Sequence, residues 1–101
     1  MKYLFEDNEY ELIKNYKDAF DKDEFTERYT DYFYDYDYIV GDIAYGKLRL
    51  KGFYDEKNKK ANKINNYKNL PSYLKNNCAT DCKYFVLKKM TKRDSNKVKK
   101  M

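Results

Sequence analysis

The sequence has 101 residues, enough for one small domain with a modest core. It contains no apolar run near the roughly 18 residues that span a bilayer, too few cysteines for a disulfide scaffold, and no histidine to serve as a base or metal ligand. Residues 1–46 carry 13 acids and 5 bases (net −8), and residues 47–101 carry 4 acids and 17 bases (net +13), which together give the overall charge of +5.

The chain begins with a predicted hairpin followed by a helix. In residues 2–16 a short apolar run, Tyr3-Leu4-Phe5, leads to a polar turn, and apolar and charged side chains alternate after it, which predicts two short strands. Asp21 is a suitable N-cap, Glu24 completes a capping box, and Phe20 with Phe25 forms a hydrophobic staple. We therefore predict a helix over roughly residues 22–34.

A second hairpin is predicted over residues 36–54. Apolar and polar residues alternate in two runs on either side of the segment 42–47, and all three glycines lie in this region. Leu48 and Leu50 should face the core, while Arg49 and Lys51 should share the opposite face.

The last third of the domain alternates between loop and regular structure. Residues 55–69 are rich in Lys and Asn and predict a solvated, mobile loop. A short helix with Pro71 in its first turn should follow, with Leu70, Tyr73 and Leu74 on one face. Residues 83–89 read as a strand that is apolar on both faces, and therefore central. The basic residues after 89 predict a disordered tail.

These elements predict an α+β fold in the order β-β-α-β-β-α-β, with a mainly antiparallel sheet of about five strands and two helices on one face. Residues 1–89 should form the domain and residues 90–101 the tail.

The second hairpin also carries a family resemblance. The residues YDYIVGD (36–42) and LRLKGFY (48–54) resemble the signature of the YutD-like family, small cytosolic proteins of Gram-positive bacteria and mollicutes. Cys78 and Cys82, followed by KYFVL (83–87), resemble the family's closing segment. The sequence departs from the family at Ile43-Ala44, where Trp-Gly is expected. The resemblance implies an α+β domain and a cytoplasmic location, and it implies no particular activity.

Few residues could carry chemistry. Cys78 and Cys82 are weak candidates for a metal site, because a structural zinc site needs four ligands and the chain has no other cysteine or histidine. A regulatory disulfide is a second interpretation, and packing of two small side chains is the favoured one. Asp37 and Asp42 should lie on opposite strand faces, so they should not form an acid–base pair, and Asp42 should stabilise a turn. We expect no cofactor.

The second hairpin provides the predicted binding face. Arg49, Lys51 and Phe53 share one side of a strand, which is how sheet-based RNA binders hold phosphate while a base stacks on a ring. The ligand-binding candidates are Lys47, Arg49, Lys51, Phe53, Asp42 and Tyr45. The alternative is a solvated face on which a helix covers Phe53. The charge asymmetry has two interpretations as well: it favours an acidic partner for the basic half, or the two halves attract each other.

A non-catalytic module that engages RNA or a ribonucleoprotein through its basic half is the function we favour. The alternative is a protein–protein adaptor that uses an acidic, Tyr-rich surface formed by Tyr29, Tyr32, Tyr34, Tyr36 and Tyr38. The other interpretation of these tyrosines is that alternate ones line the core and the rest are exposed. A small enzyme is the third possibility, disfavoured by the absence of histidine. We expect no membrane partner, and the sequence does not determine the oligomeric state.

Overall fold

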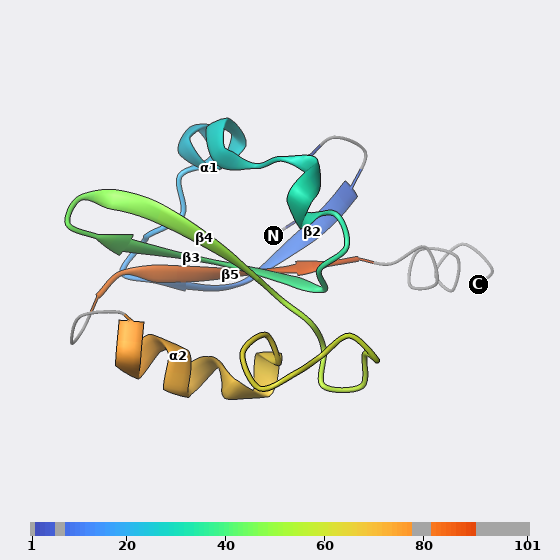
Figure 1. Cartoon of the computed structure of the whole chain (residues 1–101). Helices are drawn as coiled ribbons and strands as arrows, with labels where there is room; N and C mark the ends of the chain where they lie inside the picture. Colours follow the sequence, from blue (N-terminus) through green and yellow to red (C-terminus); the bar gives the residue numbers. More distant parts are fainter. Residues whose placement is uncertain (1, 6–7, 78–81, 91–101) are drawn as a thin grey trace.

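The structure is a computed structural model that describes residues 2–5, 8–77 and 82–90. Within them the strands and α-helices follow one another in the predicted order, and two short 3-10 helices are added: β1 (Lys2–Phe5), β2 (Asn8–Tyr16), α1 (Lys22–Arg28), η1 (Asp31–Phe33), β3 (Tyr38–Ala44), β4 (Lys47–Phe53), η2 (Tyr67–Asn69), α2 (Leu70–Asn77) and β5 (Tyr84–Lys89). The strands form one antiparallel sheet in the order β1-β2-β5-β3-β4 (Figure 1). The predicted α+β fold with an antiparallel sheet is confirmed.

The centre of the sheet is β5, as its sequence predicts. Phe85, Val86 and Leu87 are completely buried, and β5 pairs with β2 on one side and β3 on the other. A strand that presents apolar side chains to both faces needs cover on both.

The two helices therefore lie on opposite faces of the sheet, and the prediction that both pack on one face is wrong (Figure 1). On one face, Phe25 of α1 packs in a cluster with Ile39 and Phe85. On the other, Leu70 of α2 packs with Val40 and Val86. Alternate residues of the central strands thus supply two separate cores, and each core takes one helix.

The first helix is shorter than predicted. Asp21 caps it, and its Oδ1 atom accepts a hydrogen bond from the Glu24 backbone N–H at 3.1 Å. The helix ends at Arg28, and Tyr29 takes an extended conformation, with φ −76° and ψ 127°. Leaving the helix lets the buried Tyr29 hydroxyl bond that of Tyr10 at 2.9 Å. The short helix η1 then continues the chain, so the aromatic spacing that suggested one long helix is divided between two elements.

The β3–β4 hairpin is confirmed, and its register pairs Tyr38 with Phe53 at one end and Ala44 with Lys47 at the other. It is closed by Tyr45 and Gly46, both at positive φ. Strand β4 pairs only with β3 among the described strands, so its other side is an edge of the sheet.

A chain of local hydrogen bonds shapes the loop after β4, which the sequence predicted to be mobile. Side-chain oxygens of Asp55, Asn58, Asn62 and Asn66 each accept a bond from the backbone N–H two residues later. Such turns fix a loop that has little apolar packing. The predicted tail, except for Met90, lies outside the described residues. No helix in the described part of the chain is long and apolar enough to cross a membrane.

Candidate functional site

The predicted binding face of β4 exists, but its aromatic residue is covered. Arg49, Lys51 and Phe53 share one face of the strand, the face on which α2 packs. Phe53 is completely buried, and its ring meets that of Tyr73 of α2 edge-on at 5.5 Å between centroids. The expectation that a base could stack on Phe53 is therefore wrong, and the alternative in which a helix covers the ring is the one observed.

Arg49 is held by a carboxylate on the neighbouring strand. Its Nε and Nη2 atoms donate to Oδ1 and Oδ2 of Asp42 at 3.1 and 2.8 Å. Asp42 is only 1% exposed, whereas the Arg49 side chain is 45% exposed. These hydrogen bonds and the charge of Asp42 raise the pKa of Arg49. Asp42 thus lies within the strand and neutralises a neighbouring cation, and the prediction that it stabilises a turn is wrong.

A groove lies along the free edge of β4, and we call it the β4 groove. Its first hollow, of about 500 Å³, is lined by backbone and side chains of β4, by the loop after it, and by tyrosines from η1 and α2. These residues are Tyr32, Tyr36, Arg49, Leu50, Lys51, Gly52, Asn62, Ile64, Asn65 and Tyr73. Two of the apolar side chains are open to solvent, since Tyr32 is 65% and Ile64 is 74% exposed. The hollow is in the size range of small-ligand pockets, about 300–1,000 Å³.

The groove continues into a second hollow of about 380 Å³. Lys51, Ile64 and Tyr73 line both hollows, so the second adjoins the first. The second is otherwise lined by Lys63 and by polar residues of η2 and α2, namely Asn69, Ser72 and Asn76. Among the described residues that line either hollow, none is an aspartate or a glutamate, so the groove presents cations to a ligand.

Lys51 lies at the junction of the two hollows. Its Nζ atom is 5.3 Å from the ring centroid of Phe53 and 5.8 Å from that of Tyr73. A cation over an aromatic ring is attracted to the ring's electron-rich face, so both rings hold the ammonium in place. Burial and the negative charge of Asp42 raise the pKa of Tyr73.

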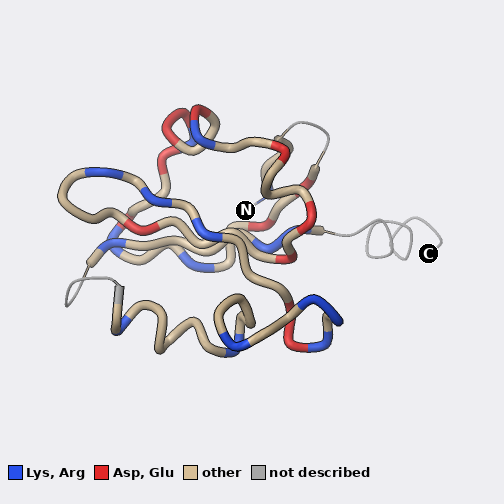
Figure 2. The backbone as a smooth tube through the Cα atoms, in the orientation of Figure 1, with Lys and Arg blue, Asp and Glu red and all other residues tan. Residues whose placement is uncertain are grey.

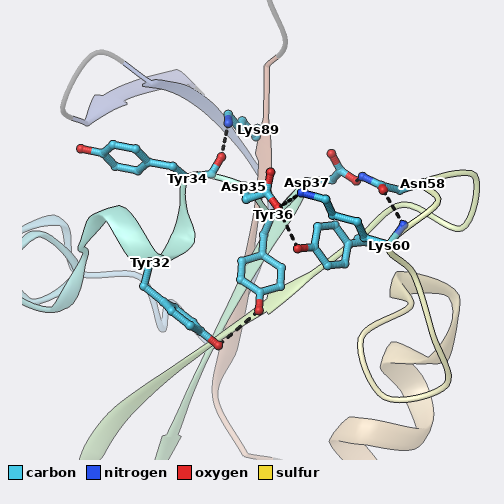
Figure 3. A network of polar contacts seen from close by, with 9 residues as sticks. Tyr32, Tyr34, Asp35, Tyr36, Asp37, Asn58, Lys60 and Lys89 are labelled. Atoms are coloured by element: carbon cyan, nitrogen blue, oxygen red, sulfur yellow. Dashed lines mark hydrogen bonds and ion pairs between the residues drawn. The ribbon is translucent and has the colours of Figure 1, made fainter.

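Tyr32 and Tyr36 form one wall of the first hollow. Their hydroxyls lie 3.2 Å apart and share a hydrogen bond (Figure 3), which together with partial burial raises the pKa of Tyr36 to about 12. The Tyr36 ring crosses Gly52 so closely that a Cβ there would stand 2.3 Å from the ring. Within the predicted acidic, Tyr-rich surface, Tyr29 and Tyr38 are buried in the two cores. These tyrosines thus divide between core and surface, as the alternative interpretation held.

Carboxylates just before β3 hold the first part of the loop after β4. Asp37 accepts hydrogen bonds from the Asp55 backbone N–H and the Asn58 side chain at 2.8 and 3.0 Å. Asp35 pairs with Lys60 (Figure 3) and also accepts a bond from the Tyr54 hydroxyl. The hydrogen bonds from Lys60 and Tyr54 lower the pKa of Asp35. These contacts attach the loop to the sheet.

The charge asymmetry of the sequence has a spatial counterpart. Figure 2 shows acidic positions gathered over α1 and the chain that follows it, and basic positions along β4 and in the loop after it. Two of the contacts between the halves are ion pairs, Asp42 with Arg49 and Asp35 with Lys60. Part of the charge asymmetry therefore stabilises the fold. Lys51 and Lys63, which are not in these two ion pairs, line the groove.

The remaining candidate residues lie elsewhere. Tyr45 is fully exposed at the hairpin tip with φ 53°, and Lys47 is exposed beside it. Neither lines the described groove. Cys82 is disulfide-bonded, and Cys78 lies outside the described residues. No cluster of three potential metal ligands occurs in the part of the chain that the structure describes.

Sequence reasoning missed Tyr32, Ile64 and Tyr73 as groove residues, whereas Lys63 is one of the loop lysines expected to extend the basic patch. The sequence places Tyr32 in the Tyr-rich surface and Tyr73 on an apolar helix face, and Ile64 is a single apolar residue in a polar loop. The isolated isoleucine among Lys and Asn was no signal by itself, because single exposed apolar side chains are common on protein surfaces.

Comparison with known proteins gives consistent matches. A family model described as "YutD-like: Putative antitoxin YutD-like" matches residues 4–88. A Bacillus subtilis (strain 168) protein named "Putative antitoxin YutD" is 46% identical over 89 residues, which cover 88% of this chain and 98% of the relative. The solution NMR structure of protein yutD from B. subtilis superposes with a TM-score of 0.77 at 44% identity, covering 91% of this chain and 84% of that one.

Proposed function

The chain belongs to the YutD-like family, and from that premise we propose that it is a non-catalytic binding module that holds single-stranded RNA in the β4 groove. The observation that carries the proposal is the lining of the groove. Lys51 and Lys63 supply positive charge, Tyr32 supplies an exposed ring, and the described lining includes no carboxylate.

Single-stranded nucleic acid is the ligand that such a lining fits. Proteins that bind it combine a positively charged groove with aromatic side chains on which bases stack. Tyr32 takes the stacking role that the sequence assigned to Phe53, because Phe53 is buried and Tyr32 is open to solvent. A duplex is a poorer fit, because base faces are accessible to a ring only where bases are unstacked.

The paired state of Arg49 changes which cations should contact phosphate. Its guanidinium already donates two hydrogen bonds to Asp42, so its charge is largely balanced. Lys51 and Lys63 line the groove and take part in no ion pair among the described residues. They are the phosphate contacts in this proposal.

The word antitoxin stands in the descriptions of the relatives. An antitoxin role for this chain is compatible with the proposal, because an antitoxin that acts by binding needs a ligand surface and no reacting groups. The open edge of β4 favours one other candidate, an adaptor that takes an extended acidic peptide as an additional strand.

Fluorescence anisotropy with a labelled single-stranded RNA of about 10 nucleotides, at several salt concentrations, tests the proposal. The logarithm of the binding constant should fall linearly with the logarithm of the salt concentration. Lys51→Gln/Lys63→Gln should make this slope shallower by about 1.4, because each phosphate that the protein no longer neutralises removes about 0.7 from it. Lys2→Gln/Lys22→Gln is the matched control, because it removes the same charge from exposed positions outside the groove. Equal slopes for the two variants would place the RNA elsewhere, and no binding at low salt would leave the peptide adaptor as the surviving candidate.

A further inference from the structure

The two hollows of the β4 groove differ in chemistry. The first is walled by the rings of Tyr32 and Tyr36, whose hydroxyls bond each other. The second is walled by hydroxyl and amide side chains of α2 and η2. Stacking on a ring tolerates any base, whereas amides and hydroxyls hydrogen-bond the edges of bases and can distinguish them.

The polar wall of the second hollow is built on a helix. Ser72 and Asn76 are four residues apart on α2, which places them one above the other on the same helix face. Both are exposed, while Leu70 on the same helix is buried against the sheet. Asn69 joins them, and its side-chain amide donates to the Lys63 carbonyl at 3.1 Å, which fixes its orientation.

Lys51 separates a hollow suited to stacking from a hollow suited to hydrogen bonding. It lines both, and its ammonium lies over the rings of Phe53 and Tyr73. In a nucleic-acid strand, consecutive bases are likewise separated by one phosphate. An anionic phosphate at Lys51 would therefore direct one base into each hollow.

On the basis of the proposed function, we propose that the second hollow is a base-reading subsite. In this arrangement two consecutive nucleotides of a single-stranded RNA occupy the groove. One base stacks on Tyr32 in the first hollow, their shared phosphate pairs with Lys51, and the next base hydrogen-bonds Asn76 and Ser72. Base preference then originates at α2, while most of the salt-dependent affinity originates at the lysines.

Short single-stranded oligoadenylate, oligocytidylate and oligouridylate, titrated against the wild-type chain and Asn76→Ala, test the subsite. The wild type should distinguish its best from its worst oligomer by about 5-fold or more. Asn76→Ala should bring that ratio close to one while the salt slope stays unchanged, because no cation has been removed. Thr26→Ala, an exposed polar residue of α1 outside the β4 groove, is the control and should keep the wild-type ratio.

The outcomes separate this inference from the proposed function. If the wild type binds all three oligomers equally, the base-reading subsite is refuted and the RNA-binding groove stands. If Asn76→Ala keeps the wild-type ratio, discrimination lies elsewhere and the inference is again overturned. Binding to none of the oligomers at low salt would refute the proposed function itself. A circular dichroism spectrum of Asn76→Ala identical to that of the wild type confirms that α2 is intact.

Discussion

Asp42 and Arg49 face each other across the β3–β4 ladder, and the two carboxylate oxygens accept from two guanidinium nitrogens at 3.1 and 2.8 Å. The pair is asymmetric, because the carboxylate is buried and the guanidinium reaches solvent. Removing one partner therefore has a different cost from removing the other.

We predict that Arg49→Leu destabilises the fold by about 3 kcal/mol, because it leaves a buried carboxylate without its cation. Asp42→Asn should cost less, about 1–2 kcal/mol, because the half-exposed guanidinium can turn to water. Urea unfolding of both variants measures the difference. The reverse order would mean that the buried carboxylate does not depend on Arg49.

The hairpin and its pair show what the sequence could and could not predict. Alternation in residues 36–54 predicts the strands, and a two-residue turn at Tyr45-Gly46 necessarily sets Asp42 opposite Arg49. The sequence does not predict the position of the turn, because Tyr is not a typical residue for positive φ and the segment 42–47 is compatible with several turns. Arg49 was therefore predicted to bind a ligand, whereas its guanidinium pairs with Asp42 within the sheet.

Other differences have the same origin in long-range packing. The local signals at Asp21 and Glu24 place the start of α1 correctly, but the contact of Tyr29 with Tyr10 ends the helix early. The apolar pattern of 83–89 identifies the central strand, but which helix covers which face depends on contacts between distant segments. The β4 groove joins segments far apart in the sequence, so no local pattern could reveal it.

The N-cap of α1 provides a second prediction. Asp21→Ala should lower the free energy of unfolding by about 1 kcal/mol, because the Glu24 backbone N–H loses its acceptor. Thermal unfolding followed by circular dichroism measures the change. A midpoint that does not move would show that water replaces the cap without cost.

Two glycines should respond differently to alanine. A Cβ at Gly41 would lie 2.2 Å from the completely buried Phe85 ring, so Gly41→Ala should cost about 3 kcal/mol or more. A Cβ at Gly52 would meet the Tyr36 ring, which is only partly buried and can move outward. Gly52→Ala should therefore lose less stability and weaken RNA binding by displacing a wall of the groove. Equal losses of stability would contradict this difference.

The loop contact at Asp35 predicts a dependence on pH. Lys60 and Tyr54 lower the pKa of Asp35 from its ordinary value of 3.8, so its charged form is favoured in the folded state. Its contribution to stability is present above about pH 4 and is lost as the pH falls through the lowered folded-state pKa. Asp35→Asn should be less stable than the wild type at neutral pH, and the difference should shrink as the pH falls below about 4 and through the lowered folded-state pKa. A constant difference across this range would exclude a charge effect at Asp35.

An amide chemical-shift titration with a single-stranded RNA of about 10 nucleotides tests the central claim most directly, because it reports the position of the ligand and its affinity together. The account predicts that the largest changes lie along the edge of β4 at Leu50, Lys51 and Gly52, and across the groove at Ile64 and Tyr73. Changes confined to α1 and the strands beneath it, or no changes at low salt, would contradict it.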